Sequence, residues 1–93
     1  MIRVAGGRVE VSGPMTMAGA AVLLAEGEAA IAENSLVFNL AGVTDMDSSC
    51  LAVIFGWMRA ARDAGKVVRL LNPPRNLLSL AEVYGVSDLL PRH

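Results

Sequence analysis

The chain has 93 residues, of which 54% are apolar and only 4% aromatic, and eight basic against nine acidic side chains leave a formal net charge of −1. This length suits one domain, so we treat residues 1–93 as a single unit whose core is built from small aliphatic side chains. The scattered basic residues argue against nucleic-acid binding, and no apolar run approaches the ~20 residues of a membrane span.

The first third of the chain predicts a hairpin followed by a helix. Ile2 to Ala5 and Arg8 to Ser12 read as two strands joined by a pair of glycines, which suits a tight turn. We expect Gly13-Pro14 to break the second strand. A helix should then begin at an N-cap on Thr16 and run to about Ala32.

The rest of the chain alternates between strands and helices. Ser35 to Ala41 is apolar at nearly every position, as in a strand covered on both faces, and Val67 to Leu71 reads as another buried strand. The segment from Leu51 to Ala64 predicts a helix that Gly65 ends. A last helix should run from about Arg75 to Tyr84, with Tyr84 on its packed side.

The predicted order is therefore strand, strand, helix, strand, helix, strand, helix. Short connections between alternating strands and helices favour an α/β domain in which a small mixed β-sheet carries helices packed mainly on one face.

The most informative segment is Val43 to Leu51, where an acid and two hydroxyls stand between an apolar strand and an apolar helix. The first N–H groups of a helix have no partner within it, and Asp47, Ser48 or Ser49 could satisfy them as a cap. The same exposed N–H groups attract phosphate or the polar surface of another protein. Capping and partner binding can coexist, and we expect at least one of the three residues to cap.

At about 100° per residue, the polar and very small residues of this helix fall on one narrow strip. The strip consists of Ser48, Ser49, Ala52, Gly56, Arg59 and Asp63. It could simply face water. Alternatively, Ala52 and Gly56 form a shallow track beside the serines over which another protein could lie. We expect Trp57 and Cys50 to belong to the core.

Catalysis is not expected. A nucleophile such as Ser49 or Cys50 would need a neighbouring base, and the one histidine is His93 at the end of the chain. The sequence has no Gly-rich phosphate loop and no metal-ligand cluster, so we predict no cofactor and no metal. Direct binding of a small ligand or lipid near the strip remains a separate possibility.

Several segments together resemble a STAS domain, and the resemblance covers nearly the whole chain. They are Asn39 to Gly42, Val43 to Ala52, Gly65 to Leu70 and Leu80 to Val86. The tail from Leu80 to Arg92 is similar to the ending of the MlaB-like branch. Cys50 stands where the family usually has glycine.

The resemblance implies a noncatalytic adaptor or regulatory subunit. In the MlaB-like branch the domain binds the ATPase of a phospholipid-transporting ABC system, and the residue matching Ser48 contributes to that contact. We therefore expect Asp47, Ser48, Ser49, Ala52, Gly56 and Arg59 to bind an ATPase partner.

The alternative branch is that of anti-sigma-factor antagonists, in which the serine matching Ser49 is phosphorylated by a kinase that is also the partner. One cysteine and the absence of an apolar leader after Met1 favour a cytoplasmic protein, which would reach the inner membrane only through its partner.

Overall fold

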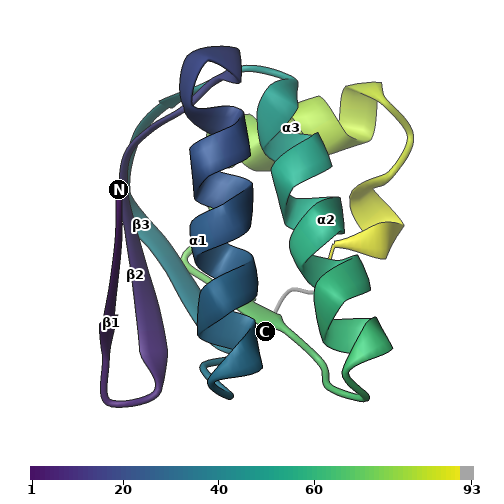
Figure 1. The fold of residues 1–93 in the computed structure, drawn as a ribbon. Helices are drawn as coiled ribbons and strands as arrows, with labels where there is room; N and C mark the ends of the chain where they lie inside the picture. Colours follow the sequence, from purple (N-terminus) through teal and green to yellow (C-terminus); the bar gives the residue numbers. More distant parts are fainter. Residues whose placement is uncertain (91–93) are drawn as a thin grey trace.

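The structure is a computed structural model that describes residues 1–90 (Figure 1). Pro91 and Arg92, which carry part of the resemblance in the tail, and His93 lie outside the described residues. The elements are β1 (Ile2–Ala5), β2 (Arg8–Met15), the 3-10 turn η1 (Met17–Gly19), α1 (Ala20–Ala32), β3 (Val37–Met46), α2 (Ser49–Asp63), β4 (Arg69–Leu71), α3 (Arg75–Val83) and the 3-10 turn η2 (Ser87–Leu89). The predicted order of strands and helices is confirmed.

The four strands form one mixed sheet in the order β1-β2-β3-β4. β1 and β2 are the antiparallel hairpin, whereas β2 with β3 and β3 with β4 are parallel pairs. β4 is short and pairs only with Val37, Phe38 and Asn39 at the start of β3. The later part of β3 therefore continues beyond β4 and leads directly to the start of α2.

The predicted break at Gly13-Pro14 is wrong, because β2 continues to Met15. β1 pairs with β2 only as far as Val11, so at Pro14 the side of β2 that faces β1 has no partner strand. Proline is tolerated where its missing N–H is not needed in the ladder. The pairing of β2 with β3 also shifts register next to Pro14, which is typical of a bulge.

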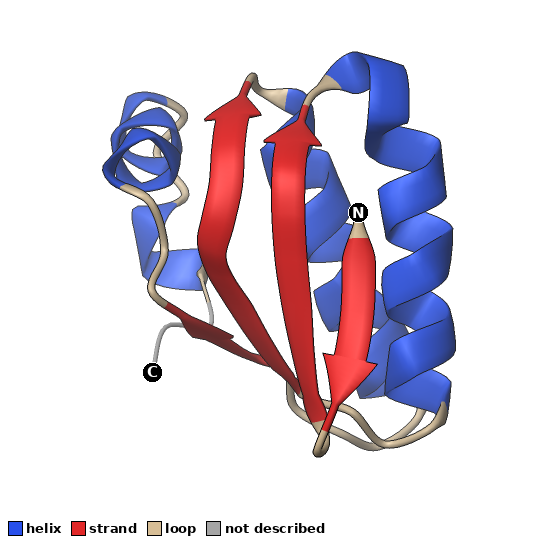
Figure 2. Ribbon diagram, turned by 90° about the vertical axis from the view of Figure 1, so that its left-hand side faces the viewer, coloured by secondary structure: helices blue, strands red, loops and turns tan. Residues whose placement is uncertain are grey.

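The helices lie mainly on one face of the sheet, as predicted, and Figure 2 shows the other face uncovered. Burial alternates between neighbouring side chains of β3 for this reason. Phe38 and Leu40 are fully buried under the helices, whereas Asn39 is half-buried and Ala41 is exposed. The expectation that this strand is covered on both faces is therefore wrong.

α1 and α2 pack side by side through Trp57, which is fully buried. Its indole N–H donates to the carbonyl oxygens of Leu23 and Leu24 at 3.2 and 3.3 Å. Its ring lies 4.5 Å from that of Phe38, centroid to centroid. The predicted core position of Trp57 is confirmed, and this residue connects both helices to the sheet.

Two other expectations near the C-terminus need correction. Only Arg69–Leu71 of the predicted strand pairs with the sheet, and Val67 is 71% exposed. Tyr84 follows the end of α3 and is 57% exposed, so it does not share the buried side of that helix with Leu77 and Ala81.

Candidate functional site

Asp47 connects three segments at one end of the molecule. One carboxylate oxygen accepts a hydrogen bond from the N–H of Ser49 at 2.8 Å, and the other accepts from the N–H of Met17 at 3.1 Å. Its own N–H donates to the carbonyl of Met15 at 3.4 Å. Asp47 therefore caps α2, as expected for one of the three polar residues, and also ties the start of α2 to the connection between β2 and α1.

These hydrogen bonds favour the ionised form of Asp47. The N–H of Met17 is the largest cause that lowers the pKa of this carboxyl below its ordinary value of 3.8, and the N–H of Ser49 is the next. Both donors stabilise the ionised form. The start of α2 therefore carries a negative charge at neutral pH, held in place by two backbone N–H groups.

The two serines remain accessible beside this cap. Ser48 is exposed, and its side chain makes no capping hydrogen bond. Ser49 is half-buried, and its hydroxyl also contributes to lowering the pKa of Asp47. Asp47 accepts the hydrogen bond from the first N–H of α2, so the hydroxyl of Ser48 is available to another molecule.

The predicted strip on α2 is correct at some positions and wrong at Gly56. Ala52 and Arg59 are exposed and lie on the same side of α2 as Ser48. Gly56 is buried, and a Cβ at this position would lie 2.5 Å from Cδ1 of Leu24 on α1. The helix wheel placed Gly56 on the open strip because a sequence does not show where the neighbouring helix lies.

Exposed apolar side chains lie near the start of α2, and the sequence analysis did not predict them. Met17, whose N–H binds Asp47, is 76% exposed, and Val83 on α3 is 80% exposed. Met46 and Leu80 are half-buried. The sequence does not indicate that Met17 is exposed, because its exposure depends on the position of η1 before α1. For α3, the apolar residues that lie outside its buried side could have indicated an exposed apolar surface.

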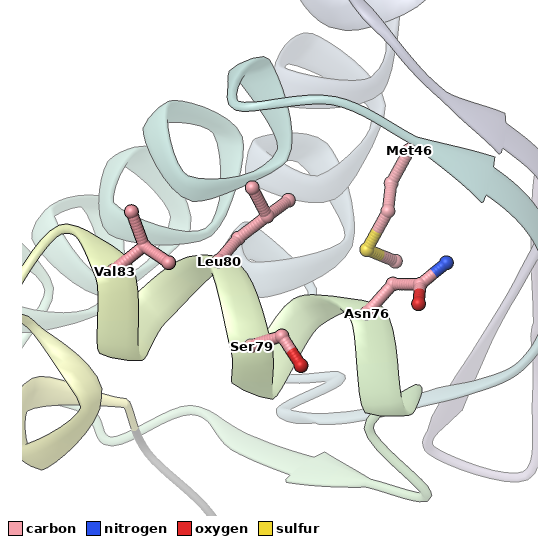
Figure 3. Close-up of a pocket in the computed structure, with 5 residues that line it drawn as sticks. All are labelled: Met46, Asn76, Ser79, Leu80 and Val83. Carbon is pink, nitrogen blue, oxygen red and sulfur yellow. The ribbon is translucent and has the colours of Figure 1, made fainter.

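A notch lies between the end of β3 and α3, as Figure 3 shows. It has a volume of about 300 Å³ and is lined by Met46, Asn76, Ser79, Leu80 and Val83. Met46 immediately precedes Asp47, so the notch adjoins the start of α2. The start of α2 therefore combines accessible serines with a neighbouring apolar notch.

Cys50 belongs to the core, as predicted. It is fully buried, and its thiol donates to the sulfur of Met46 at 3.9 Å. Burial, followed by the charge of Asp47, raises the pKa of the thiol to about 11. A thiol of this kind stays protonated at neutral pH and is a poor nucleophile.

Within residues 1–90, no three His, Cys, Asp or Glu side chains are grouped so that they could hold a metal ion. The helices of this same part of the chain are too short or too polar to cross a bilayer.

Comparisons with known proteins relate this arrangement to one family. The family model described as "Mlab, STAS domain" matches residues 2–91. The Haemophilus influenzae protein named "Intermembrane phospholipid transport system binding protein MlaB" is 37% identical over 51 residues. The aligned stretch covers 55% of this chain and 49% of that protein, so the chain spans about half the length of the relative.

Solved structures share the fold at low sequence identity. A Thermotoga maritima protein assigned as an anti-sigma factor antagonist matches with a TM-score of 0.76 at 12% identity, covering 99% of this chain and 83% of that one. The phosphorylated form of the Bacillus cell fate determinant SpoIIAA matches with a TM-score of 0.69 at 17% identity, covering 100% and 89%. The unphosphorylated form of SpoIIAA matches with a TM-score of 0.66 at 18% identity, covering 88% of this chain and 80% of that one. With the family model matched over nearly its whole length, the chain belongs to the MlaB-type STAS domain family.

Proposed function

We propose that this domain is a noncatalytic adaptor that binds the ATPase subunit of a phospholipid-transporting ABC system through the start of α2. Ser48 and Ser49 lie at the centre of the contact, with Ala52 and Arg59 extending it along the helix. The observation that carries the proposal is the accessible pair of serines at the start of α2, with the exposed Met17 tied to Asp47 and the apolar notch next to Met46. Apolar surface of this kind on a small domain marks an interaction site.

The family supports the class of partner. The Haemophilus relative is named as a component of a phospholipid transport system, and this chain belongs to the same family. The wider group of STAS folds includes anti-sigma factor antagonists. Both names describe regulatory or accessory proteins, which fits a domain that works by binding.

Within this contact the residues have different roles. Asp47 already binds two backbone N–H groups, so it holds the serines in position and adds negative charge beside them. Gly56 is buried against α1 and is left out of the contact. The notch beside Met46 and Leu80 would take an apolar side chain of the ATPase.

The effect on the transporter follows from selective binding. An adaptor that binds one conformation of the ATPase more tightly than another stabilises that conformation and changes turnover without taking part in hydrolysis. Such a domain would be located at the inner membrane through its partner.

The proposal is tested by Ser48→Arg. A bulky cation at the centre of the contact should abolish copurification with the ATPase subunit, whereas Ala5→Arg, at the exposed hairpin end of β1, should leave it unchanged. Both variants should keep the circular dichroism spectrum and melting temperature of the wild type. Normal copurification of a folded Ser48→Arg protein would rule out this site.

The second candidate is an anti-sigma-factor antagonist switched by phosphorylation of Ser49. The partial exposure of Ser49 at the start of a helix favours it, because a helix N-terminus stabilises phosphate. The charge of Asp47 opposes it. Ser49→Asp distinguishes the two: full release of the partner supports the phosphorylation switch, and weakened binding to the ATPase supports the adaptor.

A further inference from the structure

Two neighbouring hollows lie along the C-terminal half of α2, away from the serines. The first, of about 340 Å³, is lined by Phe55, Met58, Arg59 and Arg62. The second, of about 200 Å³, shares two of these residues and is lined by Met58, Arg62, Lys66, Val67 and Val68. Each hollow combines an apolar wall with at least one cationic side chain. We call the set Phe55, Met58, Arg59, Arg62 and Lys66 the arginine face.

The arginine face is locally positive on a chain whose formal net charge is −1. Arg59 and Arg62 are exposed. Lys66 donates from its ammonium to the carbonyl of Ile31 at 3.1 Å, which holds a third positive charge at the edge of the face. Asp63 is the one acidic residue of α2. It is exposed one turn after Arg59, so it offsets part, but not all, of the positive charge of the three cations.

We propose that the arginine face binds an acidic segment of the ATPase subunit, one that places an apolar side chain in a hollow and carboxylates on Arg59 and Arg62. This inference rests on the proposed docking of α2 on that subunit. Planar guanidinium groups bind carboxylates through two parallel hydrogen bonds, which favours an acidic peptide over a neutral one. The exposed strip continues from Ser48 through Ala52 to Arg59, so one partner can cover both ends of α2.

The shape of the surface favours a protein segment over an anionic membrane. The apolar side chains line hollows, which receive a side chain, whereas membrane-binding surfaces insert protruding apolar groups. An anionic membrane would attract each cation by about 1 kcal/mol but would leave both hollows unfilled. A bound peptide can use both the hollows and the charges.

The first experiment measures binding of the purified ATPase subunit to the wild type and to the double variant Arg59→Gln/Arg62→Gln. Loss of two exposed ion pairs should weaken binding roughly two- to thirty-fold at low salt. Wild-type affinity should fall between about 50 and 300 mM NaCl, and the variant should respond much less, because salt screens exposed charges. The matched control Arg8→Gln/Arg69→Gln removes the same charge from exposed positions in β2 and β4 and should bind as the wild type does.

The outcomes separate this inference from the proposed function. If the wild type binds and Ser48→Arg does not, but the double variant keeps the wild-type affinity and salt dependence, the inference is wrong and the proposed function stands. Binding of the isolated domain to phosphatidylglycerol vesicles, lost in the double variant, would assign the face to a membrane and also overturn the inference.

A photoreactive residue tests which segment of the ATPase subunit covers the face. With p-benzoylphenylalanine in place of Met58, illumination of the complex should crosslink the domain to a peptide of the ATPase subunit that is rich in Asp or Glu, identified by mass spectrometry. The crosslink should disappear with Arg59→Gln/Arg62→Gln. The absence of a crosslink, or a crosslinked peptide that is neutral or basic, would overturn the inference.

Discussion

At the scale of single residues, the start of α2 divides its polar groups between structure and recognition. Asp47 provides the cap through two hydrogen bonds, and Ser48 makes none. A short acid that is fixed by backbone donors keeps the helix end in place whether or not a partner is present. This separation lets the serines change without loss of the fold.

The role of Asp47 leads to a pH-dependent prediction. Asp47→Asn should melt a few degrees below the wild type at neutral pH, because the amide NH2 that replaces one carboxylate oxygen cannot accept a hydrogen bond, so the N–H of Met17 or of Ser49 loses its acceptor. The folded-state pKa is lowered, so the contribution of the ionised carboxylate is complete above the ordinary value of 3.8 and is lost as pH falls through the folded-state value. The two melting temperatures should therefore converge in acid.

Thermal melts recorded from neutral pH into strong acid test this prediction. The exposed Asp63 makes a matched control, since Asp63→Asn removes a carboxylate that caps no helix. An offset between wild type and Asp47→Asn that stays constant down to the lowest pH would show that the charge of Asp47 does not stabilise the fold.

At the scale of elements, α1 and α2 interlock through two glycines. A Cβ at Gly27 would collide with the indole nitrogen and two carbons of Trp57, and a Cβ at Gly56 would meet the end of the Leu24 side chain. The collisions differ in kind. Trp57 is held by two hydrogen bonds in the core, whereas the end of a leucine can rotate.

We expect Gly27→Ala to lower the free energy of unfolding by about 2 kcal/mol, although alanine favours helices by up to about 1 kcal/mol, because Trp57 must move and lose its hydrogen bonds. Gly56→Ala should lower the free energy of unfolding by less, because the end of the Leu24 side chain can move away. In Gly19→Ala the new Cβ meets nothing within 4 Å, so the loss of stability should stay below about 1 kcal/mol, which is the usual disadvantage of alanine at a helix N-cap. Urea unfolding gives all three values, and an unchanged Gly27→Ala would contradict the interlock.

At the scale of the whole molecule, part of the apolar surface that the core does not use lies near the start of α2. The exposed Met17 and the notch of Figure 3 lie there, and the β1–β2 hairpin turn lies at the other end of the sheet (Figures 1 and 2). A partner that contacts α2 and the notch would therefore leave the hairpin free.

This arrangement predicts where hydrogen exchange slows on partner binding. Amides of the start of α2 and of α3 should gain protection in the complex with the ATPase subunit, because both elements border the serines. Amides of the β1–β2 turn should exchange at the same rate in the free and bound domain. Protection confined to the hairpin would place the interface elsewhere.

Much of this molecule was predictable from local patterns. The order of elements, the hairpin turn, the C-terminal ends of the helices and the cap at the start of α2 depend on residues that are near one another in the sequence. The same holds for the core position of Trp57, since a large apolar side chain on a mostly apolar helix has few other places. The hydroxyls at positions 48 and 49 were also visible as a break in apolar sequence. The predicted N-cap at Thr16 was wrong, because its side chain makes no capping hydrogen bond and α1 begins at Ala20, after the turn η1.

Only the tertiary structure decided which of those residues face the outside. Gly56 looked open on a helix wheel, but α1 covers it, and Gly13-Pro14 did not end β2 because β1 does not reach that far. The apolar surroundings of the serines come from η1, β3 and α3, which are distant in the chain. Exposure depends on neighbours that the packing of helices on the sheet brings together, and spacing along one segment does not contain that information.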